Sequence, residues 1–229
     1  MKAGIVGLLD APNETIDTIH NSTIQEGIEY RYAIEPSETF DDTDLPQTVQ
    51  SGQAAMEVPE EVEQIEIHDG EITSNTNVQT ETKYTQWILI PGELIIVEDS
   101  GGQFMYDLLS VELNWEAHRA ELDLTKMASD YEETQLWKMG FYDHFGTAQK
   151  GVVYGDNVIE DQDIGHALGE SQINQLGLQY EYEGNMTKLT LAESGYVELY
   201  QPSEFTSGDF AEYLVEEVDD YIVGVYDEE

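Results

Sequence analysis

Alternating apolar residues in the last quarter of the sequence constrain the fold more than any other feature. Residues 178–182 alternate apolar and polar side chains, which is the period of a half-buried β-strand. Two further runs of strand character, 188–192 and 196–200, follow after glycine-containing turns at 183–185 and 193–195. Because short glycine turns join antiparallel neighbours, the sequence predicts three antiparallel strands in this quarter.

A helix is predicted directly after these strands, and the same arrangement occurs earlier in the chain. Asp209 is expected to cap a helix whose apolar positions run from Phe210 to Ile222 at helical spacing. Residues 82–97 likewise predict a hairpin with its turn at Pro91-Gly92, followed by a short helix that begins at Phe104. Two interpretations remain open: a duplicated α+β unit, or the similarity that any two hairpin–helix units share.

The remaining segments extend this organisation. We predict a strand at 28–34, a hairpin turn at Asp69-Gly70 and a strand at 118–124. Helices are predicted at 14–25, 125–136 and 161–175, and a long exposed polar loop at 35–61. The predicted fold class is therefore α+β: an antiparallel sheet built from hairpins, with helices packed on one face. It is divided into an N-terminal half (1–113) and a C-terminal half (114–229) that form either two units or one.

Residues 189–222 resemble the hairpin–helix half-repeat of the TATA-binding protein family. The resemblance is carried by Glu193-Ser194-Gly195-Tyr196-Val197. It implies a TATA-binding-protein-like topology of two related hairpin–helix halves. The basic residues that contact phosphate in that family are missing from this segment, so the resemblance implies a topology and not DNA binding.

The charge of the chain concerns its environment more than its fold. It contains 49 Asp and Glu against 8 Lys and Arg, a formal net charge of −41, and the acids are spread as 17, 13 and 19 over 1–76, 77–152 and 153–229. Like charge disfavours direct binding to nucleic acid and to anionic membranes. An even acidic excess is typical of haloarchaeal proteins, because molar salt screens the repulsion within such a surface. An acidic mimic of nucleic acid is the alternative.

Other features of the sequence limit where the protein is expected to be located and which chemistry it can perform. The N-terminus lacks a signal-peptide pattern and no apolar run is long enough to span a bilayer, so we expect a soluble cytoplasmic protein. Cysteine is absent, which excludes disulfides and thiolate chemistry. No nucleotide-binding loop, HExxH motif or nucleophile elbow occurs.

Two clusters contain side chains suited to a metal or an anion. In a helix over 161–170, Asp163, His166 and Glu170 would share one face, and such ligands suit a divalent cation. Asp143 and His144 lie in an aromatic segment, and with Arg119 they suit an anionic ligand or a proton transfer. The alternative for both clusters is a solvated surface or a turn. Because the chain has only two arginines, we also expect Arg119 to have a specific carboxylate or ligand partner.

Aromatic residues on the C-terminal strands suggest a binding surface. Tyr180, Tyr182, Tyr196 and Tyr200 are predicted to leave part of an aromatic face exposed to a partner. The leading functional hypothesis is therefore a non-enzymatic protein-interaction or self-assembly module of a halophile, without a required cofactor. A metal-dependent enzyme with a site around 156–170 and an acidic nucleic-acid mimic are the alternatives.

Overall fold

The protein folds mainly into antiparallel strands, in a computed structural model that describes residues 1–131, 134–143, 149–161 and 171–227. The coarse prediction of an α+β fold based on an antiparallel sheet is confirmed. The strands are β1 (Ala3–Asp10), β2 (Ile19–Gln25), β3 (Ile28–Phe40), β4 (Val49–His68), β5 (Glu71–Ile90), β6 (Leu94–Val97), β7 (Glu116–Leu122), β8 (Gln135–Tyr142), β9 (Gly151–Tyr154), β10 (Gln172–Tyr182), β11 (Asn185–Ala192), β12 (Tyr196–Gln201) and β13 (Ile222–Val225). The helices are α1 (Phe104–Leu113), α2 (Leu124–Asp130) and α4 (Ser207–Glu217), with single 3₁₀ turns η1 (Ser100–Gln103) and η2 (Asp219–Tyr221).

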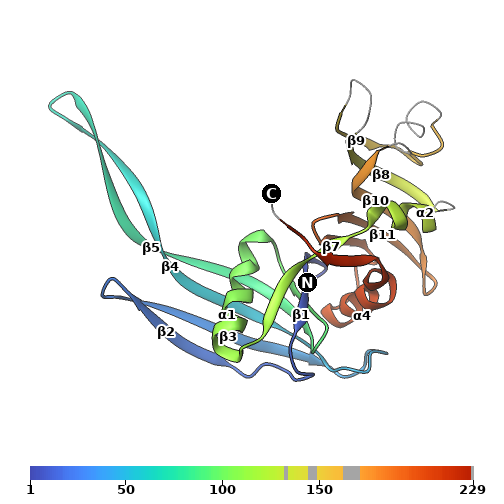
Figure 1. Ribbon diagram of the computed structural model, residues 1–229, viewed down its shortest axis with the longest axis horizontal. Helices are drawn as coiled ribbons and strands as arrows, with labels where there is room; N and C mark the ends of the chain where they lie inside the picture. Colours follow the sequence, from blue (N-terminus) through green and yellow to red (C-terminus); the bar gives the residue numbers. More distant parts are fainter. Residues whose placement is uncertain (132–133, 144–148, 162–170, 228–229) are drawn as a thin grey trace.

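The strands form one sheet that passes through both predicted halves of the chain. Its order is β2-β3-β4-β5-β6-β1-β12-β11-β10-β8-β9, and β7 pairs with β1 and β13 outside this path. In Figure 1, β2 to β5 lie on one side of the molecule and β8 to β11 on the other. One edge of β1 pairs with β6, while the other is shared between β12 and β7. The first strand is therefore the element that connects the two halves.

The centre of the sheet is buried on both faces. Side chains of β5 and β6 alternate between two apolar clusters: Ile88 and Ile96 pack in the cluster that contains Phe210 of α4, and Leu89 and Ile95 pack in the one that contains Met105 of α1. Because successive side chains of a strand point to opposite faces, α1 and α4 cover opposite faces of the central strands. The prediction that the helices pack on one face is wrong. Its error arises because residues 87–90 and 94–97, buried on both sides, lack alternation that would distinguish the faces.

The glycine turn at 193–195 packs against the place where the neighbour of β1 changes from β12 to β7. Gly195, between β11 and β12, has φ +79°, and a Cβ there would lie 2.5 Å from the Ala120 carbonyl oxygen of β7. The Gly195 carbonyl accepts a hydrogen bond from the Val6 N–H of β1 at 2.9 Å. Only glycine combines this conformation with so close a backbone approach. The predicted turn at 193–195 is confirmed as a turn, and it is packed inside the fold.

The predictions for residues 14–25 and 35–61 are wrong, because most of both segments forms β-strands. Residues 14–25, predicted as a helix, contain strand β2, which pairs with β3 through a turn at Glu26-Gly27 with φ 52° and 83°. Residues 35–61, predicted as a long loop, are mostly strand. Pro36 lies at a register shift between β3 and β4, and Pro59 lies where β4 has no outer neighbour. Bulges and sheet edges are where strands tolerate proline.

Helix boundaries also differ in detail. The helix predicted at 125–136 ends at Asp130, and β8 begins soon afterwards. Helix α4 is capped by Thr206 rather than Asp209. The Thr206 hydroxyl accepts from the Asp209 N–H, and the Asp209 carboxylate accepts from the Thr206 N–H, forming a capping box. None of the helices among the described residues is long and apolar enough to cross a membrane.

Candidate functional site

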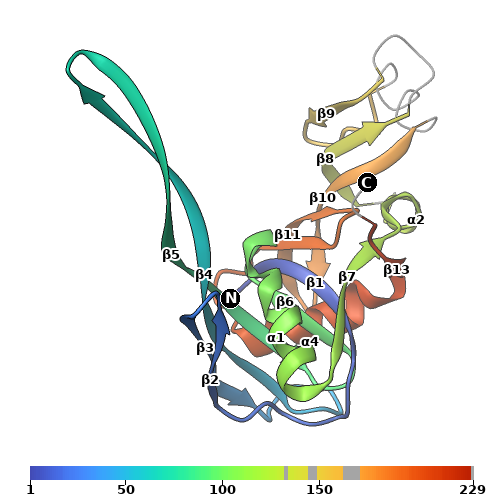
Figure 2. The ribbon, with the colours of Figure 1, turned by 60° about the vertical axis from the view of Figure 1, so that its left-hand side comes forward.

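The most prominent surface feature is a two-stranded hairpin that projects from the sheet (Figures 1 and 2). We call it the arm and define it as residues 57–84, the outer parts of β4 and β5. Strand β3 pairs with β4 only as far as Met56, and β6 pairs with β5 only from Trp87 onwards. Beyond these points each arm strand has only the other as a partner among the described residues. The twelve positions from 57 to 68 correspond to about 40 Å of extended strand.

The tip of the arm exposes aliphatic side chains. Ile65, Ile67 and Ile72 are 66%, 75% and 76% exposed. Ile67 and Ile72 are directly paired across the hairpin, and Ile65 is two positions from Ile67, so all three lie on one face. The exposed trio is unusual for a polar arm, because isolated exposed apolar residues are common but clustered ones mark contact surfaces.

An arginine–carboxylate pair fixes the base of the arm. The Arg31 guanidinium of β3 donates to both carboxylate oxygens of Glu57, at 2.8 and 3.2 Å, and the Arg31 N–H donates to the same carboxylate. This contact holds the pKa of the Glu57 carboxyl below its usual value. Sequence reasoning expected a specific carboxylate or ligand partner for Arg119. The structure shows a carboxylate partner for the other arginine, Arg31, at the point where β4 extends beyond β3.

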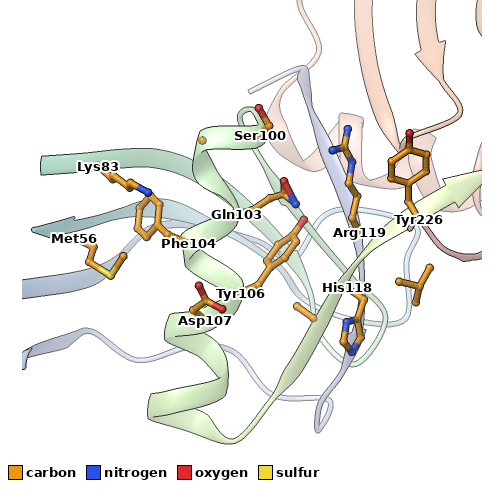
Figure 3. Close-up of a pocket in the computed structure, with 13 residues that line it drawn as sticks. Met56, Lys83, Ser100, Gln103, Phe104, Tyr106, Asp107, His118, Arg119 and Tyr226 are labelled. Atoms are coloured by element: carbon orange, nitrogen blue, oxygen red, sulfur yellow. The ribbon is translucent and has the colours of Figure 1, made fainter. Parts of the chain in front are cut away.

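A cavity of about 510 Å³ lies beside the arm base, between β5, α1 and β7 (Figure 3). Lys83, His118 and Arg119 are among its lining residues, in a chain with few basic side chains. The buried Tyr106 hydroxyl also lines it and has no hydrogen-bond partner among the described residues. Burial raises the pKa of Tyr106, and the Arg119 charge acts in the opposite direction. These donors would suit an anionic group.

Arg119 holds the fold together at this cavity. Its Nε donates to the Ser194 carbonyl of the glycine turn, and its guanidinium lies 5.1 Å from the centre of the Tyr226 ring. Arg119 thereby connects β7, the turn at 193–195 and the segment after β13. The prediction of a specific ligand for Arg119 is not tested, and its observed contacts are structural.

The four tyrosines predicted as a partner surface lie in two separate places. Tyr180 and Tyr182 pack with the apolar cluster beneath α4, whereas Tyr196 and Tyr200 alternate with the buried Val197 and are directed to the opposite side of β12. The Tyr196 and Tyr200 hydroxyls both donate to Glu198. The four side chains therefore do not form one surface.

Beneath α4, tyrosine hydroxyls converge on a glutamate. The Tyr180 hydroxyl donates to the Glu217 carboxylate at 2.9 Å and is 2.6 Å from the Tyr213 hydroxyl, while the Tyr131 hydroxyl donates to the same carboxylate. Burial is the main cause that raises the pKa of Tyr180, Tyr213 and Tyr131. A network of this kind stabilises the attachment of α4 to β10.

Tyr200 belongs to an aromatic and lysine cluster on the other face. Trp137 contacts the rings of Tyr154 and Tyr200, at centroid distances of 6.5 and 6.1 Å. The Lys188 ammonium lies 4.5 Å from the centre of the Trp137 ring. The Lys138 ammonium lies 5.9 Å from the centre of the Tyr154 ring, so both lysines of this cluster are placed over aromatic rings.

Most of the predicted metal and acid–base residues fall outside the part of the chain that the structure describes. Asp163, His166, Glu170 and His144 lie outside the described residues. Asp143 is exposed and has φ +55°, which is the conformation of a turn. Within the described ranges, no group of three or more His, Asp and Glu side chains is arranged to hold a metal ion.

Sequence reasoning missed the arm, although its signals were present. The Asp69-Gly70 hairpin and a strand beginning at Val62 were predicted, but residues 35–61 were assigned to an exposed loop because they carry Pro36, Pro46 and Pro59 among polar residues. The informative signal lay in residues 72–80, where strand-forming Ile, Thr and Val occur among Ser, Asn and Gln without an apolar stripe, which indicates a strand without a core face.

Comparison with known proteins gives no family. No family model, no curated protein and no solved structure matches the chain. The resemblance to the TATA-binding protein family therefore stays a prediction.

Proposed function

We propose that this chain is a self-assembling protein adapted to molar salt, and that the arm is the element by which it associates. The observation that carries the proposal is the exposed trio Ile65, Ile67 and Ile72 at the tip of an otherwise unsupported hairpin. A lone two-stranded hairpin is marginal in water, because ordering it costs backbone entropy that little burial offsets. An arm with an apolar tip is stabilised once it is buried against a partner.

Charge explains why association would depend on salt. Copies that each carry a formal charge of −41 repel one another in dilute buffer. At about 1 M salt the Debye length falls to about 3 Å, so contacts between acidic surfaces become permissible. The isoleucines at the tip of the arm supply attraction that salt does not screen, since burial of apolar area is not electrostatic.

The first test is the oligomeric state, measured by light scattering on a sizing column. The KCl concentration is varied from about 0.5 to about 4 M, which spans the range over which charge repulsion becomes screened. The informative variant shortens the arm by deleting 61–68 and 71–78, which joins Glu60 to Asp69 and Gly70 to Gln79. The paired strands and the two-residue turn are then retained at a shorter length. We expect the wild type to associate with increasing KCl and the shortened protein to remain monomeric.

A second variant tests the apolar tip with a matched control. Replacing Ile65, Ile67 and Ile72 by Thr keeps β-propensity while removing the aliphatic surface. The control is Ile24→Thr with Ile28→Thr, in the exposed β2–β3 hairpin. Loss of association in the tip variant alone supports the proposal. A wild type that is monomeric at every KCl concentration, or equal loss in the control, contradicts it.

A further inference from the structure

The two free edges of the arm differ in charge. On β4, residues 57–68 contain Glu57, Glu60, Glu61, Glu63 and Glu66, together with Pro59. On β5, residues 71–83 contain Glu71, Glu81 and Lys83 near their ends, and the nine residues 72–80 between them contain no charged side chain and no proline. Charges and proline are the features that prevent a sheet edge from pairing with another chain. The β4 edge is therefore protected, and the β5 edge is open to strand addition.

The hydrogen-bonding phase of the hairpin is fixed by its turn. Asp69 and Gly70 have φ 51° and 84°, as in a type I′ turn, so the flanking pair at 68 and 71 is hydrogen-bonded. Counting alternately from that pair, Glu63–Thr76 and Pro59–Thr80 are non-hydrogen-bonded pairs, whose N–H and C=O groups point away from the hairpin. The position of Pro59 agrees with this count, because proline has no N–H to contribute to the ladder.

We propose that the β5 edges of two copies pair antiparallel about a two-fold axis at Asn77, forming a four-stranded sheet from two arms. This inference rests on the proposed self-assembly and names its partner, a second copy of this chain. Residues 71–83 lie on this free edge, because Glu98 donates to the Gln86 carbonyl at 3.2 Å and η1 covers the strand only from Thr85 onwards. Asn77 is the midpoint of 71–83, so complete overlap of two edges places it on the axis.

Charge selects the same register. With Asn77 on the axis, Glu71 of each copy lies directly opposite Lys83 of the other, and both side chains point to one face. A register shifted to Thr76 would instead oppose Glu71 and Glu81, and like charges directly opposite are unfavourable. Within the described part of the chain, Lys83 makes no ion pair, although acids are abundant. The pairing would give the one basic residue of the arm a carboxylate partner.

The same register covers the apolar tip. Ile72 lies opposite Thr82 of the second copy and diagonal to Tyr84, which is 53% exposed. Tyr84 and Ile72 are an even number of residues apart on β5, so both side chains lie on the face that carries Ile65 and Ile67. Each tip would therefore place Ile72 beside the aromatic ring at the base of the other arm.

An engineered disulfide tests the axis, because the chain has no cysteine of its own. In Asn77→Cys the two sulfurs face each other across a non-hydrogen-bonded pair, with Cα atoms about 4.5 Å apart, within the range that a disulfide spans. Asn75→Cys is the matched control on the same strand and face, and Val62→Cys samples the β4 edge at the same level. We expect covalent dimers on mild oxidation of Asn77→Cys alone.

Proline and charge variants test the edge in solution. Thr76→Pro removes an outward N–H from the β5 edge, and Glu63→Pro removes the N–H of the residue opposite it, on the β4 edge. We expect the dimer dissociation constant to rise at least about tenfold in the first and to change less than about threefold in the second. At the lowest KCl that keeps the chain folded, Glu71→Lys and Lys83→Glu should each weaken association about tenfold, and the double swap should restore it.

The outcomes separate this inference from the proposed function. Cross-linking of Asn77→Cys together with selective loss in Thr76→Pro supports the two-fold pairing. If the wild type associates but Asn77→Cys cross-links no better than Asn75→Cys, the edge pairing is refuted while arm-mediated assembly stands. Equal weakening by Thr76→Pro and Glu63→Pro refutes the choice of edge. A wild type that never associates refutes both.

Discussion

Removing the Tyr180 hydroxyl is the sharpest test of whether this residue maintains the fold or binds a partner. In the structure, the Tyr213 hydroxyl donates to Tyr180 while Tyr180 donates to the Glu217 carboxylate, the only assignment of the shared proton that satisfies both distances of 2.6 and 2.9 Å. In Tyr180→Phe, Glu217 loses one of its tyrosine donors, and the fully buried Tyr213 hydroxyl loses its acceptor.

The magnitude follows from these two losses. A hydrogen bond to a charged group contributes about 1.5–3 kcal/mol, and an unsatisfied buried polar group costs about 1–3 kcal/mol. Because the losses share one network, we expect Tyr180→Phe to lower the free energy of unfolding by about 2–4 kcal/mol. Tyr213→Phe removes only a neutral bond and should cost about 0.5–1.5 kcal/mol. The double variant should be more stable than Tyr180→Phe, because it has no orphaned hydroxyl.

The assay is urea unfolding in a fixed molar KCl concentration, followed by circular dichroism and tryptophan fluorescence. Self-association of Tyr180→Phe, measured while it is folded, should equal that of the wild type. A loss below about 0.5 kcal/mol in Tyr180→Phe, which is the scale of ordinary surface substitutions, would refute the structural role. A double variant less stable than Tyr180→Phe would refute the proposed proton arrangement.

Three further predictions concern the turn, alkaline pH and salt. Gly195→Ala should be at least about 2 kcal/mol less stable than Gly184→Ala in urea unfolding, because both glycines have φ near +80° but only the Cβ at Gly195 meets backbone, at 2.5 Å; equal losses would contradict that reason. Burial raises the pKa of Tyr142 and Tyr221 from 10.0 to about 12. The unfolded chain then binds fewer protons above pH 10, so their contribution is present below pH 10 and lost as the pH rises to about 12; tyrosinate absorbance checks the titration, and a transition complete near pH 10 without unfolding would contradict it. The free energy of unfolding should rise steeply from dilute buffer to molar KCl, since few of the acids have a basic partner; urea midpoints insensitive to KCl would contradict adaptation to salt and favour the acidic mimic.

Local sequence signals predicted the strands that have one buried face or a glycine turn. The alternation at 178–182, the turns at Asp69-Gly70 and 193–195, and the helix beginning at Phe104 all correspond to observed elements. These signals are local, because a period of two and a positive φ are properties of a few adjacent residues. Where they were absent, as in the polar strand β2, weak helical spacing gave a wrong prediction.

The candidate site was less accessible to sequence reasoning. Tyr180 and Tyr200 look alike as aromatic residues on strands, and only the placement of α4 over one face partly buries Tyr180 and leaves Tyr200 on the other face. Arg119 and Arg31 are equally rare in the sequence, but the pairing of β3 with β4 gives Arg31 its carboxylate. Such differences depend on contacts between residues far apart in the chain.

The sequence by itself determined that the chain is an antiparallel hairpin protein with an acidic surface, because residue periodicity, turn glycines and net charge are read without knowing distant neighbours. Only the tertiary structure decided that β4 and β5 continue as an arm beyond the ends of β3 and β6. A strand becomes a free edge when its neighbours stop, and where a neighbour stops is a relation between distant segments. The uncharged stretch at 72–80 had no meaning until the structure placed it on such an edge.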